Sequence, residues 1–349
     1  MLNFTIKTPT EVVFGRDIED GIGERIKEYG AHRVLVHFGG ASDRSSGLLD
    51  RVERSLFDAG LSFVELGGVS PNPKVSLVRK GVALCRREGL DFVLAVGGGS
   101  VIDSAKAIAM GAATGRDPWE FASTGTRPDK TLPVATVLTL AASGSETSNS
   151  CVLTNEETKE KRGITSETNR PVISFLNPEN TFTVSKFQTG CGIVDIMMHT
   201  LERYFNPGHP SNRMTDEIAE GLLRTVIDAG RVAMQDSHNY DAMSEIMWAG
   251  SLSHNNLTGL GGVKDFSVHQ FGHELSGMFD AAHGATLSVM WPQWARYVVD
   301  TDPARFAHYG EAVWRLTRKD GESDRDLALR AIDTTNPAAV NQIYNTAFG

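Results

Sequence analysis

The chain has 349 residues, of which 40% are hydrophobic and 22% charged, as is typical of a folded globular protein. Its formal net charge is −9 and no block of Lys and Arg stands out, so the composition excludes a nucleic-acid partner. The N-terminus has no basic start followed by an apolar run, and no apolar run could span a bilayer, so we expect no signal peptide, no membrane partner and a cytoplasmic location.

The first half of the chain predicts alternating strands and helices. The opening segment, 3–14, predicts a β-hairpin with Thr8-Pro9-Thr10 at its turn. Four β-rich runs follow, expected as strands over 33–37, 61–66, 91–96 and 133–138. Helical patterns lie between them over 47–59 and 75–88. Strands that alternate with helices indicate βαβ units and a parallel sheet.

The second half has a different pattern. After about Thr181, apolar residues occur at helical spacing with almost no strand alternation, over 188–204, 212–235, 239–256 and 284–300. We therefore expect an α/β domain of the nucleotide-binding type over residues 1–181 and an all-helical domain over residues 182–349.

A glycine-rich turn follows the third predicted strand. Residues 93–96 run into Gly97-Gly98-Gly99-Ser100, and a helical pattern begins at Val101. Glycines let the backbone approach a pyrophosphate closely, and the N–H groups at a helix N-terminus attract its charge. The motif alone leaves open both phosphate binding and an ordinary tight turn. Asp103 and Lys106, one helical turn apart, would either contact a ribose or hold this turn.

A second polar cluster, Thr139-Leu140-Ala141-Ala142-Ser143-Gly144-Ser145-Glu146, follows the strand at 133–138. Small hydroxyl residues at the carboxyl end of a strand suit the crevice in which doubly wound sheets bind ligands. The same residues would also serve as a loop that caps the next helix, and the sequence leaves both roles open.

Histidines and an aspartate at helical spacing are the most informative feature of the second half. Asp195 and His199 lie one helical turn apart on one face, as two ligands of one metal require. His269 and His273 repeat this spacing, and His283 follows before a glycine. Such nitrogen and oxygen ligands suit Zn²⁺ or Fe²⁺. Spacing leaves open which of the three later histidines bind, and whether the site is catalytic or structural.

Taken together, these residues resemble the iron-containing (group III) alcohol dehydrogenase family, in particular its NADPH-dependent butanol dehydrogenase or aldehyde reductase branch. The resemblance covers most of the chain. It rests on Gly97-Gly98-Gly99-Ser100-x-x-Asp103-x-x-Lys106, Gly144-Ser145-Glu146, Asp195-x-x-x-His199 and His269-x-x-x-His273-x9-His283. It implies a dinucleotide-binding α/β domain followed by a helical domain, the dehydroquinate synthase-like architecture. It also implies a homodimeric enzyme that interconverts small alcohols and aldehydes.

The family pattern implies roles for the histidines that spacing left open. One divalent metal, Fe²⁺ or Zn²⁺, would be bound by Asp195, His199, His269 and His283. The metal would polarise the carbonyl while hydride passes between the nicotinamide and the carbonyl carbon. His273 would face the nicotinamide and relay a proton, with His254 as a weaker candidate for that role.

The same resemblance implies a set of cofactor contacts. The pyrophosphate would contact Gly97, Gly98, Gly99 and Ser100. The other cofactor contacts implied by the resemblance are Asn72, Thr139, Ser143 and Lys161. After the strand at 33–37, the small uncharged turn Gly39-Gly40-Ala41-Ser42 stands where NAD-preferring relatives often carry an Asp. It leaves room for a 2′-phosphate, with Gly39, Gly40 and Ser42 as contacts, and so favours NADP(H) over NAD(H), although Asp43 lies close by.

Two alternatives follow from the sequence. Relatives usually carry several tens of further residues after Ala331-Ile332-Asp333, whereas here the segment 337–348 follows almost directly and resembles the family's last helix. A catalytically impaired relative with a shortened C-terminal region is therefore one alternative. The other is a dehydroquinate-synthase-like lyase, which would need clustered Lys and Arg, whereas Lys264 is the only one between Arg231 and Arg296.

Overall fold

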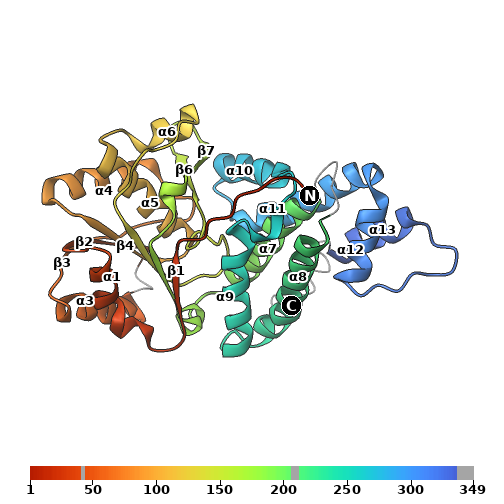
Figure 1. The fold of residues 1–349 in the computed structure, drawn as a ribbon, viewed down its shortest axis with the longest axis horizontal. Helices are drawn as coiled ribbons and strands as arrows, with labels where there is room; N and C mark the ends of the chain where they lie inside the picture. Colours follow the sequence, from red (N-terminus) through yellow and green to blue (C-terminus); the bar gives the residue numbers. More distant parts are fainter. Residues whose placement is uncertain (41–43, 206–211, 336–349) are drawn as a thin grey trace. The chain divides into compact units, whose positions relative to one another are not determined.

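The computed structural model describes residues 1–40, 44–205 and 212–335, which fall into two compact units. One is an α/β unit made of Thr8–Val184 and Ser276–Asp280. The other is a helical unit made of Met1–Lys7, Ser185–Leu275 and the described residues from Ala281 onward. An α/β domain with a parallel sheet and a helical domain were predicted, so the expected fold class is confirmed (Figure 1).

The α/β unit is built on a six-stranded sheet in the order β1-β8-β5-β4-β2-β3, and every neighbouring pair is parallel. Its strands are β1 (Glu11–Phe14), β2 (Arg33–Phe38), β3 (Ser62–Leu66), β4 (Phe92–Gly97), β5 (Val134–Leu138) and β8 (Ile173–Leu176). All residues of β4 and β5 are buried, as expected for parallel strands covered on both faces. The four predicted strands match β2, β3, β4 and β5.

Helices cover both faces of this sheet (Figure 1). On one face, α1 (Ile22–Glu28) and α3 (Leu48–Asp58) bury their apolar residues against alternate residues of the inner strands. On the other face lie α4 (Val75–Glu88) and α5 (Gly99–Thr114), with the short α6 (Pro118–Thr124) beside them. Short 3₁₀ turns occur at Ile18–Gly21, Glu167–Asn169, Pro178–Thr181, Leu257–Gly259 and Val299–Thr301.

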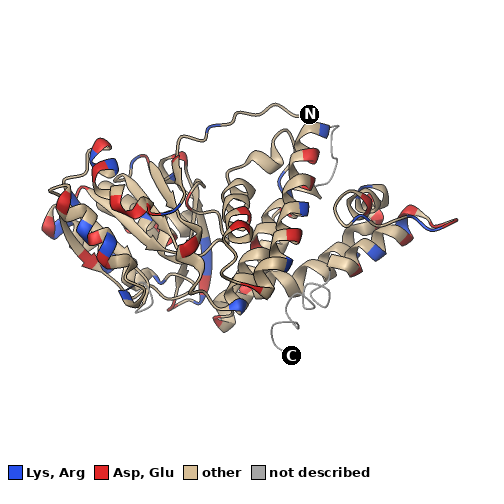
Figure 2. Cartoon of the chain, turned by 90° about the horizontal axis from the view of Figure 1, so that it is seen from below, with Lys and Arg blue, Asp and Glu red and all other residues tan. Residues whose placement is uncertain are grey.

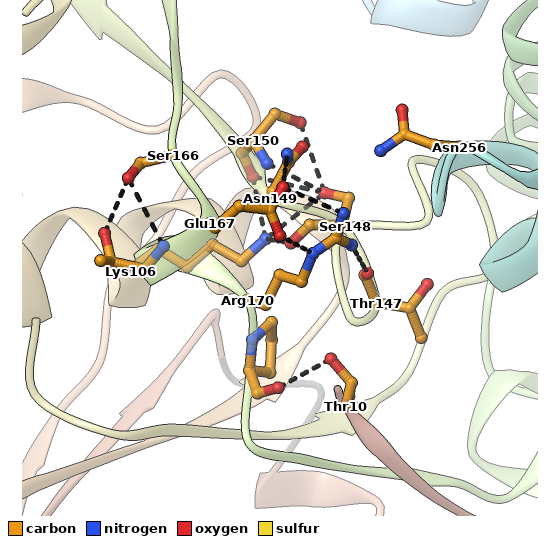
Figure 3. Close-up of polar contacts among 12 residues, drawn as sticks. Thr10, Lys106, Thr147, Ser148, Asn149, Ser150, Ser166, Glu167, Arg170 and Asn256 are labelled. Atoms are coloured by element: carbon orange, nitrogen blue, oxygen red, sulfur yellow. Dashed lines mark hydrogen bonds and ion pairs between the residues drawn. The ribbon is translucent and has the colours of Figure 1, made fainter. Parts of the chain in front are cut away.

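The N-terminal hairpin expected over 3–14 is wrong. Residues 1–10 form no strand, and β1 pairs in parallel with β8. Thr10 Oγ1 donates to Pro171 O at 2.7 Å, which ties the start of β1 to the start of β8 (Figure 3). A separate antiparallel pair, β6 (Ser150–Asn155) and β7 (Glu160–Thr165), was also not predicted.

The helical unit is arranged around α7 (Lys186–Tyr204), which is buried from Thr189 to Tyr204. The helices that pack against it are α8 (Arg213–Gln235), α9 (Tyr240–His254) and α11 (His283–Val298). The remaining helices are α10 (Ser267–Phe279), α12 (Pro303–Ala312) and α13 (Asp324–Thr335), of which the last two pack against each other. The four predicted helical segments correspond to α7, α8, α9 and α11.

Acidic and basic residues are interspersed along the outer helices of both units (Figure 2). Among the described helices, none combines the length and the apolar character that crossing a membrane requires. The predicted last helix at 337–348 lies outside the described residues.

Candidate cofactor and metal sites

The glycine turn lies where the strand order of the sheet reverses. From the neighbouring strands β2 and β4, the sheet continues to β3 on one side and to β5 and β8 on the other. Doubly wound sheets bind nucleotides beyond the carboxyl ends of the strands at such a reversal. Because β4 ends at Gly97 and α5 begins at Gly99, the N-terminus of α5 lies at this edge. The turn therefore has the arrangement of a phosphate-binding loop.

The polar loop after β5 packs directly against the glycine turn. Thr139 N donates to Gly97 O at 3.2 Å, and a Cβ on Gly99 would lie only 2.1 Å from Ser143 Oγ. A side chain at position 99 would push this loop away, so the close approach requires glycine. The structure thus brings the predicted cofactor contacts Gly97, Gly99, Thr139 and Ser143 together.

Asp103, which is half-buried, and Lys106, which is buried, hold the loop after β5. Lys106 Nζ donates to Ser145 O at 2.6 Å. It also donates to Ser150 O at 2.8 Å (Figure 3). Asp103 accepts hydrogen bonds from Ser145 Oγ at 2.5 Å and from Val152 N at 2.9 Å. Of the two roles that the sequence left open for this pair, the geometry favours holding the turn over contacting a ribose.

Asn72 and Lys161 meet elsewhere in the α/β unit. Lys161 Nζ on β7 donates to Asn72 Oδ1 at 3.0 Å, and Asn72 Nδ2 donates to Asp280 Oδ1 at the same distance. Asp280 also pairs with Lys74. These hydrogen bonds hold the pKa of Asp280 below its ordinary value. They fix Asn72, whose φ of 56° lies in the left-handed region that Asn tolerates.

The turn after β2 is open where the structure describes it. Gly40 is exposed, and a Cβ there would meet no atom within 4 Å. Gly39, which precedes it, is buried. The Arg44 guanidinium lies 5.7 Å from the centroid of the Phe38 ring at the end of β2. Ser42, the third contact predicted here, lies outside the described residues.

In the helical unit, Asp195 and His199 of α7 meet His269 of α10. Asp195 Oδ1 lies 3.4 Å from His199 Nδ1 and 3.5 Å from His269 Nε2, and the three residues are 4%, 3% and 6% exposed. These three atoms are buried and make no hydrogen bond with any residue that the structure describes. Burying such atoms unpaired is costly, so their convergence fits a shared cation.

His283, at the start of α11, lies next to this group. Its Nε2 is 3.8 Å from Asp195 Oδ1. The His273 ring centroid lies 5.2 Å from that of His283 and 6.4 Å from that of His269. This arrangement favours His283 over His273 as a fourth ligand.

Gly284 sets the position of His283. A Cβ on Gly284 would lie 2.1 Å from Cys191 O on α7, so only glycine lets the first turn of α11 approach α7 this closely. That approach is what carries His283 to the aspartate on α7.

The pKa values of two histidines in this cluster are shifted in opposite directions. Burial lowers the pKa of His199 well below its ordinary value, and the neighbouring His254 and His269 lower it further. The His254 ring centroid is 4.0 Å from that of His199. Burial acts against protonation of His269 too, but Glu202 and Asp195 raise its pKa to about 9. A neutral His199 offers the lone pair that a metal needs.

Glu202 is a residue of this site that sequence reasoning missed. It follows Asp195 by seven residues on α7, is 0% exposed, and accepts a hydrogen bond from His269 Nδ1. The spacing Asp195, His199, Glu202 is that of one helix face and could have signalled it. A helical glutamate is usually solvated, however, so that signal is weak.

Comparison with known proteins identifies the family of the chain. A family model described as iron-containing alcohol dehydrogenase matches residues 9–178, and a model described as the C-terminal part of the Fe-containing alcohol dehydrogenase family matches residues 189–337. The chain belongs to the iron-containing alcohol dehydrogenase family. It is an oxidoreductase of that family, so the family and the enzyme class predicted from the sequence are confirmed.

Relatives with named activities use either nicotinamide cofactor. NADH-dependent butanol dehydrogenase A of Clostridium acetobutylicum is 42% identical over 96% of this chain and 85% of its own length. NADPH-dependent aldehyde reductase YqhD of Escherichia coli is 36% identical over 95% of this chain and 85% of its own length. The crystal structure of NADH-dependent butanol dehydrogenase A from Thermotoga maritima has a TM-score of 0.94 at 36% identity, over 98% of this chain and 85% of that chain.

Proposed function

We propose that this member of the iron-containing alcohol dehydrogenase family interconverts small primary alcohols and aldehydes, with a nicotinamide cofactor and one divalent metal per chain. The observation that carries the proposal is the buried convergence of Asp195 Oδ1, His199 Nδ1 and His269 Nε2. His283 would complete a set of nitrogen and oxygen ligands that suits Fe²⁺ or Zn²⁺. Relatives named butanol dehydrogenase and aldehyde reductase support the substrate class.

The metal and the cofactor would supply part of the chemistry, and side chains of the protein would supply the rest. A metal at this site would supply Lewis-acid polarisation of the carbonyl, and a reduced nicotinamide would supply hydride. The proton that completes the alcohol would come from His273, which is half-buried on α10 beside His283. His254, whose ring lies against His199, is the second candidate for this proton transfer.

The cofactor would bind in the α/β unit. Its pyrophosphate would lie at Gly97-Gly98-Gly99-Ser100, where the N-terminus of α5 supplies N–H groups. Thr139 and Ser143, packed on this turn, would offer hydroxyl groups. Asn72 and Lys161 remain proposed contacts. The homodimeric state and the cytoplasmic location expected from the sequence stay predictions.

We infer that NADPH is preferred over NADH. Gly39 and Gly40, which follow β2, carry no carboxylate, and Arg44, which pairs with Glu65, lies beside the Phe38 ring that ends this strand. An arginine near the end of this strand suits a 2′-phosphate, whereas a carboxylate would favour the ribose hydroxyls of NADH. Because relatives include enzymes named for each cofactor, the preference is decided by measurement.

Both the proposed activity and the proposed cofactor preference are tested by one assay. Metal-loaded protein is assayed for reduction of butanal with NADPH and with NADH side by side. We expect turnover with a higher kcat/KM for NADPH. Gly40→Asp should reverse the preference by about tenfold or more, because its carboxylate would repel the 2′-phosphate and accept hydrogen bonds from ribose. Gly21→Asp adds the same charge at another exposed glycine with open space and should leave the preference unchanged.

The outcomes separate the two parts of the proposal. No reduction with either cofactor contradicts the proposed activity. Reduction with NADH preferred, or a Gly40→Asp protein with unchanged preference, contradicts only the cofactor assignment.

A further inference from the structure

A buried carboxylate connects α7 to the first turn of α10 in the helical unit. Glu202 is 0% exposed, and one of its oxygens accepts hydrogen bonds from Val268 N at 2.7 Å and His269 N at 3.2 Å. The other oxygen accepts a hydrogen bond from His269 Nδ1. One side chain therefore holds both the backbone and the ring of His269.

The contact at Nδ1 decides which ring nitrogen is available. Because His269 Nδ1–H donates to Glu202, Nε2 is the ring nitrogen left to offer a lone pair to an ion. His269 Nε2 is the atom that lies 3.5 Å from Asp195 Oδ1 and makes no hydrogen bond to a described residue. The carboxylate thus selects the tautomer and fixes the ring plane.

An alternative role for Glu202 is to balance the charge of the next residue, Arg203, which is buried. Arg203 Nη1 donates to Ser253 O at 3.0 Å, and its guanidinium lies 4.8 Å from the Phe266 ring centroid. Burial lowers the pKa of Arg203 to about 10, and the charge of Glu202 opposes that shift. A carboxylate kept only to balance Arg203 would not need to contact His269. The experiment must therefore separate charge from hydrogen bonding.

We propose that Glu202 is a positioning residue for the metal. It holds His269 in the tautomer and orientation that direct Nε2 at the ion, and so sets the affinity of the site. A carboxylate bonded to a ligating histidine raises the basicity of that ligand, and losing one typically weakens metal binding 10–100-fold. The inference rests on the metal ligands of the proposed function.

Zn²⁺ affinity of the full chain, measured by competition with a chromophoric chelator, tests this without an activity assay. We expect Glu202→Gln to bind Zn²⁺ about 10–100-fold more weakly than wild type. The matched control is Glu220→Gln, which removes another buried carboxylate of the same unit. Glu220 is 3% exposed and accepts hydrogen bonds from Tyr204 at 2.7 Å and His308 at 2.9 Å, so its variant should keep wild-type affinity.

A second variant separates charge from geometry and serves if Glu202→Gln does not fold. Glu202→Asp keeps the charge beside Arg203 but withdraws the carboxylate from His269 by one methylene. We expect it to bind Zn²⁺ more weakly too, with a changed Co²⁺ absorption spectrum. Urea unfolding of the metal-free proteins shows which variants are folded.

Three outcomes would overturn the inference. Wild-type affinity in Glu202→Gln contradicts it, and so does wild-type affinity in Glu202→Asp, because charge alone would then suffice. Equal losses in Glu202→Gln and Glu220→Gln also contradict it. If the wild-type protein itself binds no Zn²⁺, the proposed function fails. That result differs from the three above, which contradict only the role of Glu202.

Discussion

At the scale of single residues, the metal site consists of side chains that are costly to bury without an ion. Asp195, His199 and His269 direct three buried atoms at one another, and none of these atoms is hydrogen-bonded to a described residue. A buried polar atom left unpaired costs about 1–3 kcal/mol. Metal binding would offset that cost, so the free energy of binding should add to the stability of the helical unit.

His273 is the residue at which spacing and structure disagree most. We predict that His273→Ala keeps its metal and loses turnover by roughly 10²–10⁴-fold, the usual contribution of a general acid or base. His283→Ala, the control, should lose metal, because His283 Nε2 lies 3.8 Å from Asp195 Oδ1. Metal content and the pH profile of kcat check both. A metal-free His273→Ala protein would contradict the ligand assignment.

Some of this site could be predicted from the sequence and some could not. The Asp195–His199 pair lies within one helical turn, so its spacing is visible locally. The position of His283 depends on the contact of Gly284 with α7, which no local pattern shows. Glu202 was missed because its hydrogen-bond partners lie on α10, far along the chain, where no local pattern shows the contact.

At the scale of elements, buried β-rich runs between helices could be predicted because their composition and flanking turns are local signals. Three of the elements that were not predicted show why such signals can be missing. β7 is polar and largely exposed, with the sequence EKRGIT, so it carries no apolar alternation. β8 has only four residues. β1 pairs with β8, which is distant in the sequence, whereas the turn signal at Thr8-Pro9-Thr10 predicted a local hairpin.

A buried histidine links β2 to α5 and makes stability depend on pH. His37 Nδ1 lies 2.7 Å from Leu66 O and Nε2 lies 2.8 Å from Ser104 Oγ. Burial lowers the pKa of His37 from 6.5 to about 4. The unfolded chain therefore binds this proton first as the pH falls, so the stabilisation is present above pH 6.5 and is lost between 6.5 and about 4.

We predict that the stability advantage of wild type over His37→Gln shrinks by up to about 3 kcal/mol between pH 7 and pH 4. Urea unfolding followed by circular dichroism at several pH values measures it. His32→Gln is the control, because the His32 side chain is 80% exposed and should give no such change. Parallel pH curves for wild type and His37→Gln would show that His37 is not the group responsible.

At the scale of the whole molecule, the proposed cofactor site and the proposed metal site lie in different units. The α/β unit carries the glycine turn that would hold the hydride donor, and the helical unit carries the residues that would hold the metal. The sequence predicted this division because a strand-turn-helix motif and ligand pairs on helices are both local patterns. The fold class was predicted for the same reason, whereas the family was predicted from the resemblance of these motifs to a known family.

One divalent metal bound in the helical unit should be what allows this chain to reduce aldehydes. The most direct measurement is a titration of metal-stripped protein with Zn²⁺ or Fe²⁺ while following NADPH-dependent reduction of butanal. We expect negligible activity at the start and a rise to a plateau at about one equivalent per chain, as a single four-ligand site implies. Full activity without metal, or a plateau that requires two equivalents, would contradict it.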